Sequence, residues 1–78
     1  MIKETILKMA SEHGAVKSTC PSEIARALFP ETWRRHMAEV RAEAIDLHKQ
    51  GKVLITQKGL PVDVDHIKGP VRIKIAGG

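Results

Sequence analysis

The sequence has few aromatic residues and a single cysteine. Phe29 and Trp33 are its only aromatic residues, and tyrosine is absent. A hydrophobic core must therefore consist mainly of aliphatic side chains. Cys20 has no cysteine partner in the chain, so an internal disulfide is excluded. Because the charged segment MIKETILKMASE also lacks the apolar stretch of a signal peptide, the sequence predicts a cytoplasmic protein.

Long apolar runs are also missing. No stretch approaches the roughly 18–20 apolar residues that a membrane-spanning helix needs, so we expect no membrane insertion. A length of 78 residues and a hydrophobic content of 42% fit a single domain at 1–78, with an ordered core at about 2–75. The net charge of +4 is spread along the chain, so it permits nucleic-acid binding without marking one basic cluster.

The N-terminal half predicts two helices joined by a short extended segment. Apolar residues recur at helical spacing over about 2–12, and Gly14 is expected to end this helix in a left-handed conformation. Residues 15–18 are expected to form a bridging strand. A second helix is expected to begin at Pro21, whose missing N–H costs nothing at the first helical position, and to end near Phe29.

Cys20 has two interpretations, as a helix cap and as a nucleophile. Thr19 or Cys20 is the predicted N-cap, and with Cys20 in that role Glu23 can return a bond to the cap N–H, which is half of a capping box. As a nucleophile Cys20 would need a histidine partner, yet nothing in the spacing of the four histidines demands one. That spacing also fits no metal-ligand pattern. The sequence therefore predicts no enzyme activity, no metal site and no cofactor.

The strongest periodic signal belongs to a third helix at about 33–50. Thr32 is its predicted N-cap, and Gly51 is expected to end it. Its inward positions recur at helical spacing and are Trp33, Met37, Val40, Ala44 and Leu47. The opposite side carries Arg35, Ala38, Glu39, Ala42, Asp46 and Lys49, with Arg34 and Arg41 at its margins. We expect Trp33 to anchor the core rather than to stack on a base.

The C-terminal third predicts an antiparallel ribbon. The β-rich run at 53–56 is one expected strand, and VRIKI at 71–75 alternates between apolar and basic residues. Lys58-Gly59 is a turn signal in the connection at 58–70. Because a two-stranded ribbon alone is marginal in water, we expect its apolar face to pack on the helices. The predicted fold class is α+β, with three helices and a small antiparallel hairpin.

This element order and several short motifs resemble a known family. The motif residues are TCPSEIA at 19–25, WR at 33–34, VR at 40–41, TQKG at 56–59 and GPVR at 69–72, together with Ala44, Leu47 and Gly51. The chain resembles a winged-helix domain over about 2–75, and more narrowly a small bacterial family of winged-helix proteins of unassigned function. The resemblance implies a winged helix-turn-helix fold and an analogy to winged helices that bind DNA.

The analogy implies a set of contacts with double-stranded DNA. In a DNA-binding winged helix, the third helix enters the major groove. Arginine can form paired hydrogen bonds with guanine or phosphate, and alanine allows close approach. The leading hypothesis is therefore a DNA-binding or regulatory module. The residues implied are Arg34, Arg35, Ala38, Arg41, Ala42, Lys49, Lys58 and Arg72.

The same surface has a competing interpretation as a solvated face. Glu39 and Asp46 lie on the exposed side of the third helix, where they would repel phosphates. The two aspartates of the connection at 58–70 also cancel its two lysines. The alternative hypothesis is a protein–protein interaction module that binds a protein partner, or dimerises through an exposed patch at Ile45, without nucleic acid.

Overall fold

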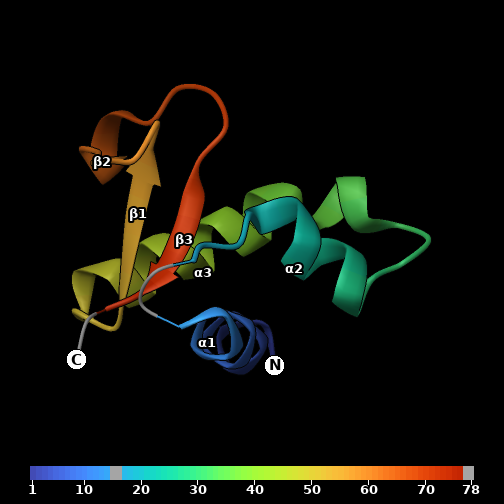
Figure 1. Ribbon diagram of the computed structural model, residues 1–78. Coiled ribbons are helices and arrows are strands. Elements are labelled where there is room, and N and C mark those ends of the chain that lie inside the picture. Colours follow the sequence, from blue (N-terminus) through green and yellow to red (C-terminus); the bar gives the residue numbers. More distant parts are fainter. Residues whose placement is uncertain (15–16, 77–78) are drawn as a thin grey trace.

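The computed structural model describes residues 1–14 and 17–76 (Figure 1). Its elements, in chain order, are α1 (Ile2–His13), α2 (Pro21–Leu28), the 3₁₀ helix η1 (Trp33–His36), α3 (Met37–Lys49), β1 (Val53–Gln57), β2 (Leu60–Pro61), the 3₁₀ helix η2 (Val64–His66) and β3 (Arg72–Ile75). In this part of the chain, three α-helices and a three-stranded antiparallel sheet form an α+β fold, as the sequence predicted. The arrangement is compatible with a winged helix.

The sheet has the strand order β2-β1-β3, and both strand pairs are antiparallel. Ile55 on β1 pairs with Ile73 on β3, and both side chains are buried on the inner face. Thr19 and Ile73 exchange two backbone hydrogen bonds of 2.7 and 2.6 Å, which protect the other edge of β3 from pairing with another chain. Of the strand predicted at 15–18, residues 15–16 lie outside the described residues, and 17–18 form no strand because the bridge forms at Thr19.

One aliphatic core joins the helices to the sheet. In Figure 1, α3 runs behind β1 and β3, and α1 lies below them. The inward positions Val40, Ala44 and Leu47 are buried as predicted. Trp33 and Met37 are only half-buried and pack at the margin of the core. The buried cluster is Ile6, Ile24, Ala25, Val40, Ala44, Leu47, Val53, Ile55, Val71 and Ile73.

The predicted third helix is divided into two parts. Trp33–His36 form a 3₁₀ turn, and the α-helix begins only at Met37. Arg35 donates its backbone N–H to the Thr32 carbonyl at 2.9 Å, whereas the Thr32 hydroxyl makes no cap bond. Because a 3₁₀ turn winds more tightly than an α-helix, the side chains of this turn leave the register of α3. Arg34 and Arg35 are both exposed, as the sequence predicted.

Two helix caps differ from their predictions in detail. Gly14 ends α1 with φ 75° and ψ −179°, so its φ is positive as expected but its ψ is extended. Cys20 is the N-cap of α2, and Pro21 is the first helical residue, as predicted. The predicted bond between the Glu23 carboxylate and the cap N–H is wrong, because this carboxylate binds other groups. The Glu23 carboxylate accepts hydrogen bonds from the Thr19 hydroxyl at 2.9 Å and from the Cys20 thiol at 3.4 Å.

The connection at 58–70 contains more structure than the predicted turn. Lys58 and Gly59 have φ values of 52° and 80° and form a two-residue hairpin loop between β1 and β2. Positive φ at both loop residues is the geometry that matches the twist of the flanking strands. The sequence analysis missed β2 because a strand of two residues that includes a proline leaves no alternating pattern. Within residues 1–14 and 17–76, every helix is too short or too polar to span a lipid bilayer.

Candidate nucleic-acid interface

The solvent side of α3 carries a narrow stripe that contains two alanines. We define this outward stripe as Ala38, Ala42, Ile45 and Lys49, which recur at helical spacing opposite the buried side. Ala38, Ala42 and Lys49 are exposed, and Ile45 is half-buried against the core. At Ala38 and Ala42, therefore, another molecule can approach the helix closely.

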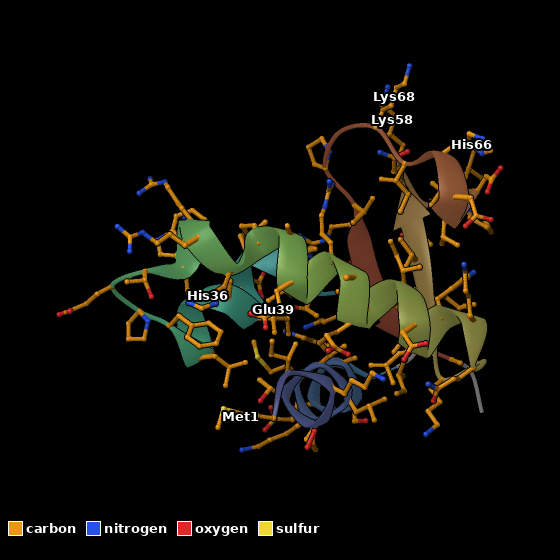
Figure 2. All side chains as sticks on the ribbon, turned by 180° about the vertical axis from the view of Figure 1, so that it is seen from behind. Met1, His36, Glu39, Lys58, His66 and Lys68 are labelled. Carbon is orange, nitrogen blue, oxygen red and sulfur yellow. The ribbon has the colours of Figure 1, made fainter. Side chains whose placement is uncertain are left out.

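The acidic residues of α3 are paired beside this stripe. Lys3 on α1 donates a hydrogen bond to the Asp46 carboxylate, and its Nζ lies 3.5 Å from Glu43. This hydrogen bond is the main cause of the raised pKa of Lys3 and the lowered pKa of Asp46. Glu39 lies 3.1 Å from Nδ1 of His36, and Figure 2 shows both on the α1 side of α3. The acids that were expected to repel phosphates are therefore held on the side of α1.

Arginines gather around Trp33 at the N-terminal end of α3. The guanidinium carbons of Arg26 and Arg34 lie 4.2 and 4.5 Å from the centre of the Trp33 ring, and exposed Arg35 follows. Stacking on the ring orients a guanidinium without neutralising its charge. Among the described residues, no carboxylate lies within ion-pair distance of these arginines. The sequence analysis missed Arg26 because only its contact with Trp33 places it here.

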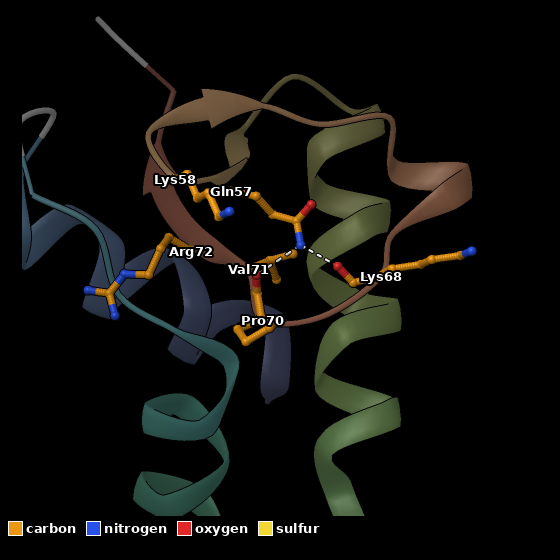
Figure 3. A pocket seen from close by; sticks show the side chains of 6 residues that line it. All are labelled: Gln57, Lys58, Lys68, Pro70, Val71 and Arg72. Carbon is orange, nitrogen blue, oxygen red and sulfur yellow. Dashed lines mark hydrogen bonds between the residues drawn. The ribbon is translucent and has the colours of Figure 1, made fainter.

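The connection at 58–70 is held at its base by two side chains, which we call the latch. Gln57 donates its amide N–H groups to the carbonyls of Lys68 and Pro70 at 2.5 and 3.0 Å (Figure 3). Arg41 donates to the carbonyl of Gly69 between them. Arg41 is half-buried, and its Nε has no hydrogen-bond partner within the described residues. Arg41, a predicted DNA contact, thus links α3 to the segment at 58–70. A phosphate would have to compete with the Gly69 carbonyl for the Arg41 guanidinium.

An open groove lies between the connection and the start of α2. Its outer part is lined by Gln57, Lys58, Lys68, Pro70, Val71 and Arg72, and it continues to Cys20, Pro21, Ser22, Met37 and Arg41. No carboxylate is among these lining residues. In Figure 3 the side chain of Lys68 points away from the groove, whereas that of Lys58 lies beside Gln57. Lys58 and Lys68 project from the outer end of the connection in Figure 2.

The other predicted contacts are engaged within the fold. Arg72 donates hydrogen bonds of 2.9 and 2.8 Å to the hydroxyl and the carbonyl of Ser18. Nζ of Lys49 lies 3.2 Å from the carboxylate of Asp65, and both side chains are exposed. Because exposed ion pairs contribute little to stability, a phosphate can replace Asp65 beside Lys49. Within residues 1–14 and 17–76, the structure thus leaves the side chains of Arg34, Arg35 and Lys58 without a hydrogen bond or an ion pair. It commits Arg41 and Arg72 to internal hydrogen bonds.

An exposed pair in the connection predicts a measurable pH dependence. His66 Nδ1 lies 2.9 Å from the Asp63 carboxylate, and their hydrogen bond raises the pKa of His66 and lowers the pKa of Asp63. The raised pKa of His66 adds to folding stability at low pH, and this stabilisation is lost as pH rises through the pKa of His66 in the folded protein. The lowered pKa of Asp63 adds stability that is lost as pH falls through the pKa of Asp63 in the folded protein. The pair therefore stabilises the fold most at pH values between these two pKa values.

We expect a histidine NMR titration to show the His66 midpoint above its ordinary value. Asp63→Asn should return this midpoint toward that value, because the main hydrogen-bond and charge partner is lost. Asp65→Asn is the matched control and should cause a smaller shift, since Asp65 is the weakest of the causes that raise the pKa of His66. Identical His66 midpoints in the original chain and in Asp63→Asn would contradict the pairing.

Comparison with known proteins identifies the family of this chain. No curated protein matches the chain significantly. A family model described as "Protein of unknown function (DUF3253)" matches residues 1–76. The match includes α1, the arginines around Trp33, the outward stripe and the connection at 58–70. The chain therefore belongs to the DUF3253 family of proteins of unknown function.

Proposed function

We propose that this protein is a winged-helix module that binds double-stranded DNA. In this proposal the outward stripe of α3 enters the major groove, and the connection at 58–70 is the wing that contacts the flanking backbone. The observation that carries the proposal is the separation between the acids of α3 and the arginines of η1, which precedes it. The acids pair with Lys3 and His36, whereas Arg34 and Arg35 stay exposed without a carboxylate partner within the described residues.

The positions of the remaining cations support this docking. The arginines around Trp33 lie near the N-terminal end of the stripe, and Lys58 and Lys68 project from the outer end of the wing (Figure 2). Cations on both sides of a helix can contact the two phosphate backbones that border a major groove. The latch formed by Gln57 and Arg41 fixes the angle between the wing and α3 before binding, which lowers the ordering cost of association.

A fluorescence anisotropy titration with a mixed-sequence duplex tests the proposal. Binding should be strongest near about 50 mM salt, where the attraction of phosphates for cations is least screened. If about four phosphates are neutralised, the plot of log affinity against log salt should have a slope of about −3 to −4. The absence of binding near about 50 mM salt would contradict DNA binding, because the sequence-independent attraction is large there.

A second candidate function is a protein-interaction module. The exposed leucines of the sheet favour it, since Leu54 on β1 is 41% exposed and Leu60 on β2 is 69% exposed. The predicted patch at Ile45 exposes less apolar surface to a partner, because Ile45 is half-buried against the core. Sedimentation that shows concentration-dependent dimers, which Leu60→Ser abolishes, would favour this function over DNA binding. A monomer at every concentration would contradict dimerisation.

A further inference from the structure

The groove between the connection at 58–70 and α2 contains an unpaired part of the sheet edge. Ile73 exchanges its backbone hydrogen bonds with Thr19, so its N–H and C=O point away from β1. Backbone polar groups alternate between the two edges of a strand, and Val71 lies two residues before Ile73 with its side chain buried on the same face. The N–H and C=O of Val71 therefore point to the same edge, yet neither has a backbone partner within residues 1–14 and 17–76.

The segment that covers this edge at Thr19 turns away before it reaches Val71. Continued antiparallel pairing would place Pro21 opposite Val71, but Pro21 has no N–H and is the first residue of α2. Cys20, Pro21 and Val71 all line the groove at this point. Val71 is only 4% exposed, and an unpaired peptide group with so little contact with water is costly. A bound ligand that pairs with these groups would remove that cost.

We propose that this edge binds an extended acidic peptide segment of a partner protein, which pairs with Val71 as an added strand. The inference does not depend on DNA binding. The C=O of a peptide accepts from the Val71 N–H, and the N–H of the same peptide residue donates to the Val71 C=O. A phosphate offers acceptors only, so it can satisfy one of the two groups. Strand addition of this kind derives its affinity from main-chain hydrogen bonds.

The charge of the groove selects an acidic segment. Lysine and arginine side chains line the groove, and its lining residues include no carboxylate. Lys58 makes no ion pair within the described part of the chain. Arg72 is hydrogen-bonded to Ser18, and its Nη1 lies 3.9 Å from the Glu23 carboxylate. A carboxylate of the partner can therefore pair with Lys58 without displacing an internal contact.

The groove also has apolar walls. Pro21 and Met37 line its inner part, and Pro70 lines both parts. Because successive side chains of a strand point to opposite faces, only every second residue of the bound segment faces the same wall. The segment that fits therefore alternates acidic and apolar residues.

The test compares two labelled peptides that differ only in their backbone donors. The first is Glu-Val-Glu-Val-Glu with blocked ends. In the second every peptide nitrogen carries a methyl group, which keeps the charges and side chains and removes the N–H groups. Fluorescence anisotropy measures both affinities. We expect the methylated peptide to bind roughly fivefold more weakly, the effect of one lost hydrogen bond.

Amide NMR locates the binding site of the unmethylated peptide. The Val71 amide signal should shift on binding, and its exchange with solvent should slow. These two changes, together with weaker binding of the methylated peptide, support the inference. Equal affinities for the two peptides, no binding of either, or an unchanged Val71 signal overturns it. If a mixed-sequence DNA duplex shifts the Val71 signal and the peptide does not, the groove belongs to the nucleic-acid interface and the inference is also overturned.

A pair of lysine variants tests the role of charge in the groove. Lys58→Asn removes the charge beside the groove, and asparagine tolerates the positive φ of 52° at this position. Lys68→Asn is the matched control, because Lys68 points away from the groove in Figure 3. We expect Lys58→Asn to weaken peptide binding by roughly two- to fivefold, as for the loss of an exposed ion pair, and Lys68→Asn to weaken it less. Equal losses in the two variants would overturn the pairing of the peptide with Lys58.

Discussion

Replacing Leu47 with alanine should lower the free energy of unfolding by about 3–5 kcal/mol. Leu47 is 1% exposed and lies in the cluster that joins α3 to the sheet. The deletion removes favourable burial and leaves a cavity that surrounding side chains fill only partly. A chain of 78 residues is expected to have a total stability of about 4–12 kcal/mol, so this one change removes a large share of it.

Chemical denaturation followed by circular dichroism measures this effect. The control is Leu60→Ala, which removes the same atoms from a side chain that is 69% exposed on β2. Its free energy of unfolding should stay within about 0.5 kcal/mol of the original value, as for most surface substitutions. Equal losses in the two variants would show that burial against α1, α2 and the sheet is not what makes Leu47 important.

The sequence predicted those parts of the fold that depend on burial alone. Val40, Ala44 and Leu47 recur every three or four residues because one side of α3 faces the core. Ile73 and Ile75 alternate with basic residues because β3 has one inner face. A pattern of this kind depends only on residues that are close in the sequence, so it can be recognised without knowledge of tertiary contacts.

The candidate site was only partly predictable, because its geometry depends on residues far apart in the chain. Arg41 and Gly69 are separated by 28 positions, and only folding shows that the guanidinium holds the connection at 58–70. Lys3 and Asp46 are 43 positions apart, so the sequence analysis counted the aspartate as an unpaired acid. Arg26 likewise acquires its place from Trp33 in the next helical segment. Spacing rules describe one helix at a time and cannot supply such pairings.

Replacing both Arg34 and Arg35 with alanine should weaken DNA binding on the order of 100-fold near about 50 mM salt. Each lost phosphate contact should also make the salt dependence shallower by about one, so a slope of about −3 to −4 should become about −1 to −2. Both side chains are exposed, and neither belongs to the buried cluster. Anisotropy titrations at several salt concentrations measure the affinity and the slope together.

The control for this double variant must remove the same charge from another surface. Lys8 on α1 and Lys52 before β1 are both exposed and lie outside the outward stripe and the wing. Their joint replacement by alanine lowers the net charge by the same amount, yet it should leave the salt slope unchanged because no phosphate contact is lost. An equal loss of DNA affinity in the two double variants would mean that binding depends only on the net charge of the protein. A selective loss with Arg34 and Arg35 would instead locate the phosphates beside Trp33, on whose ring Arg34 stacks.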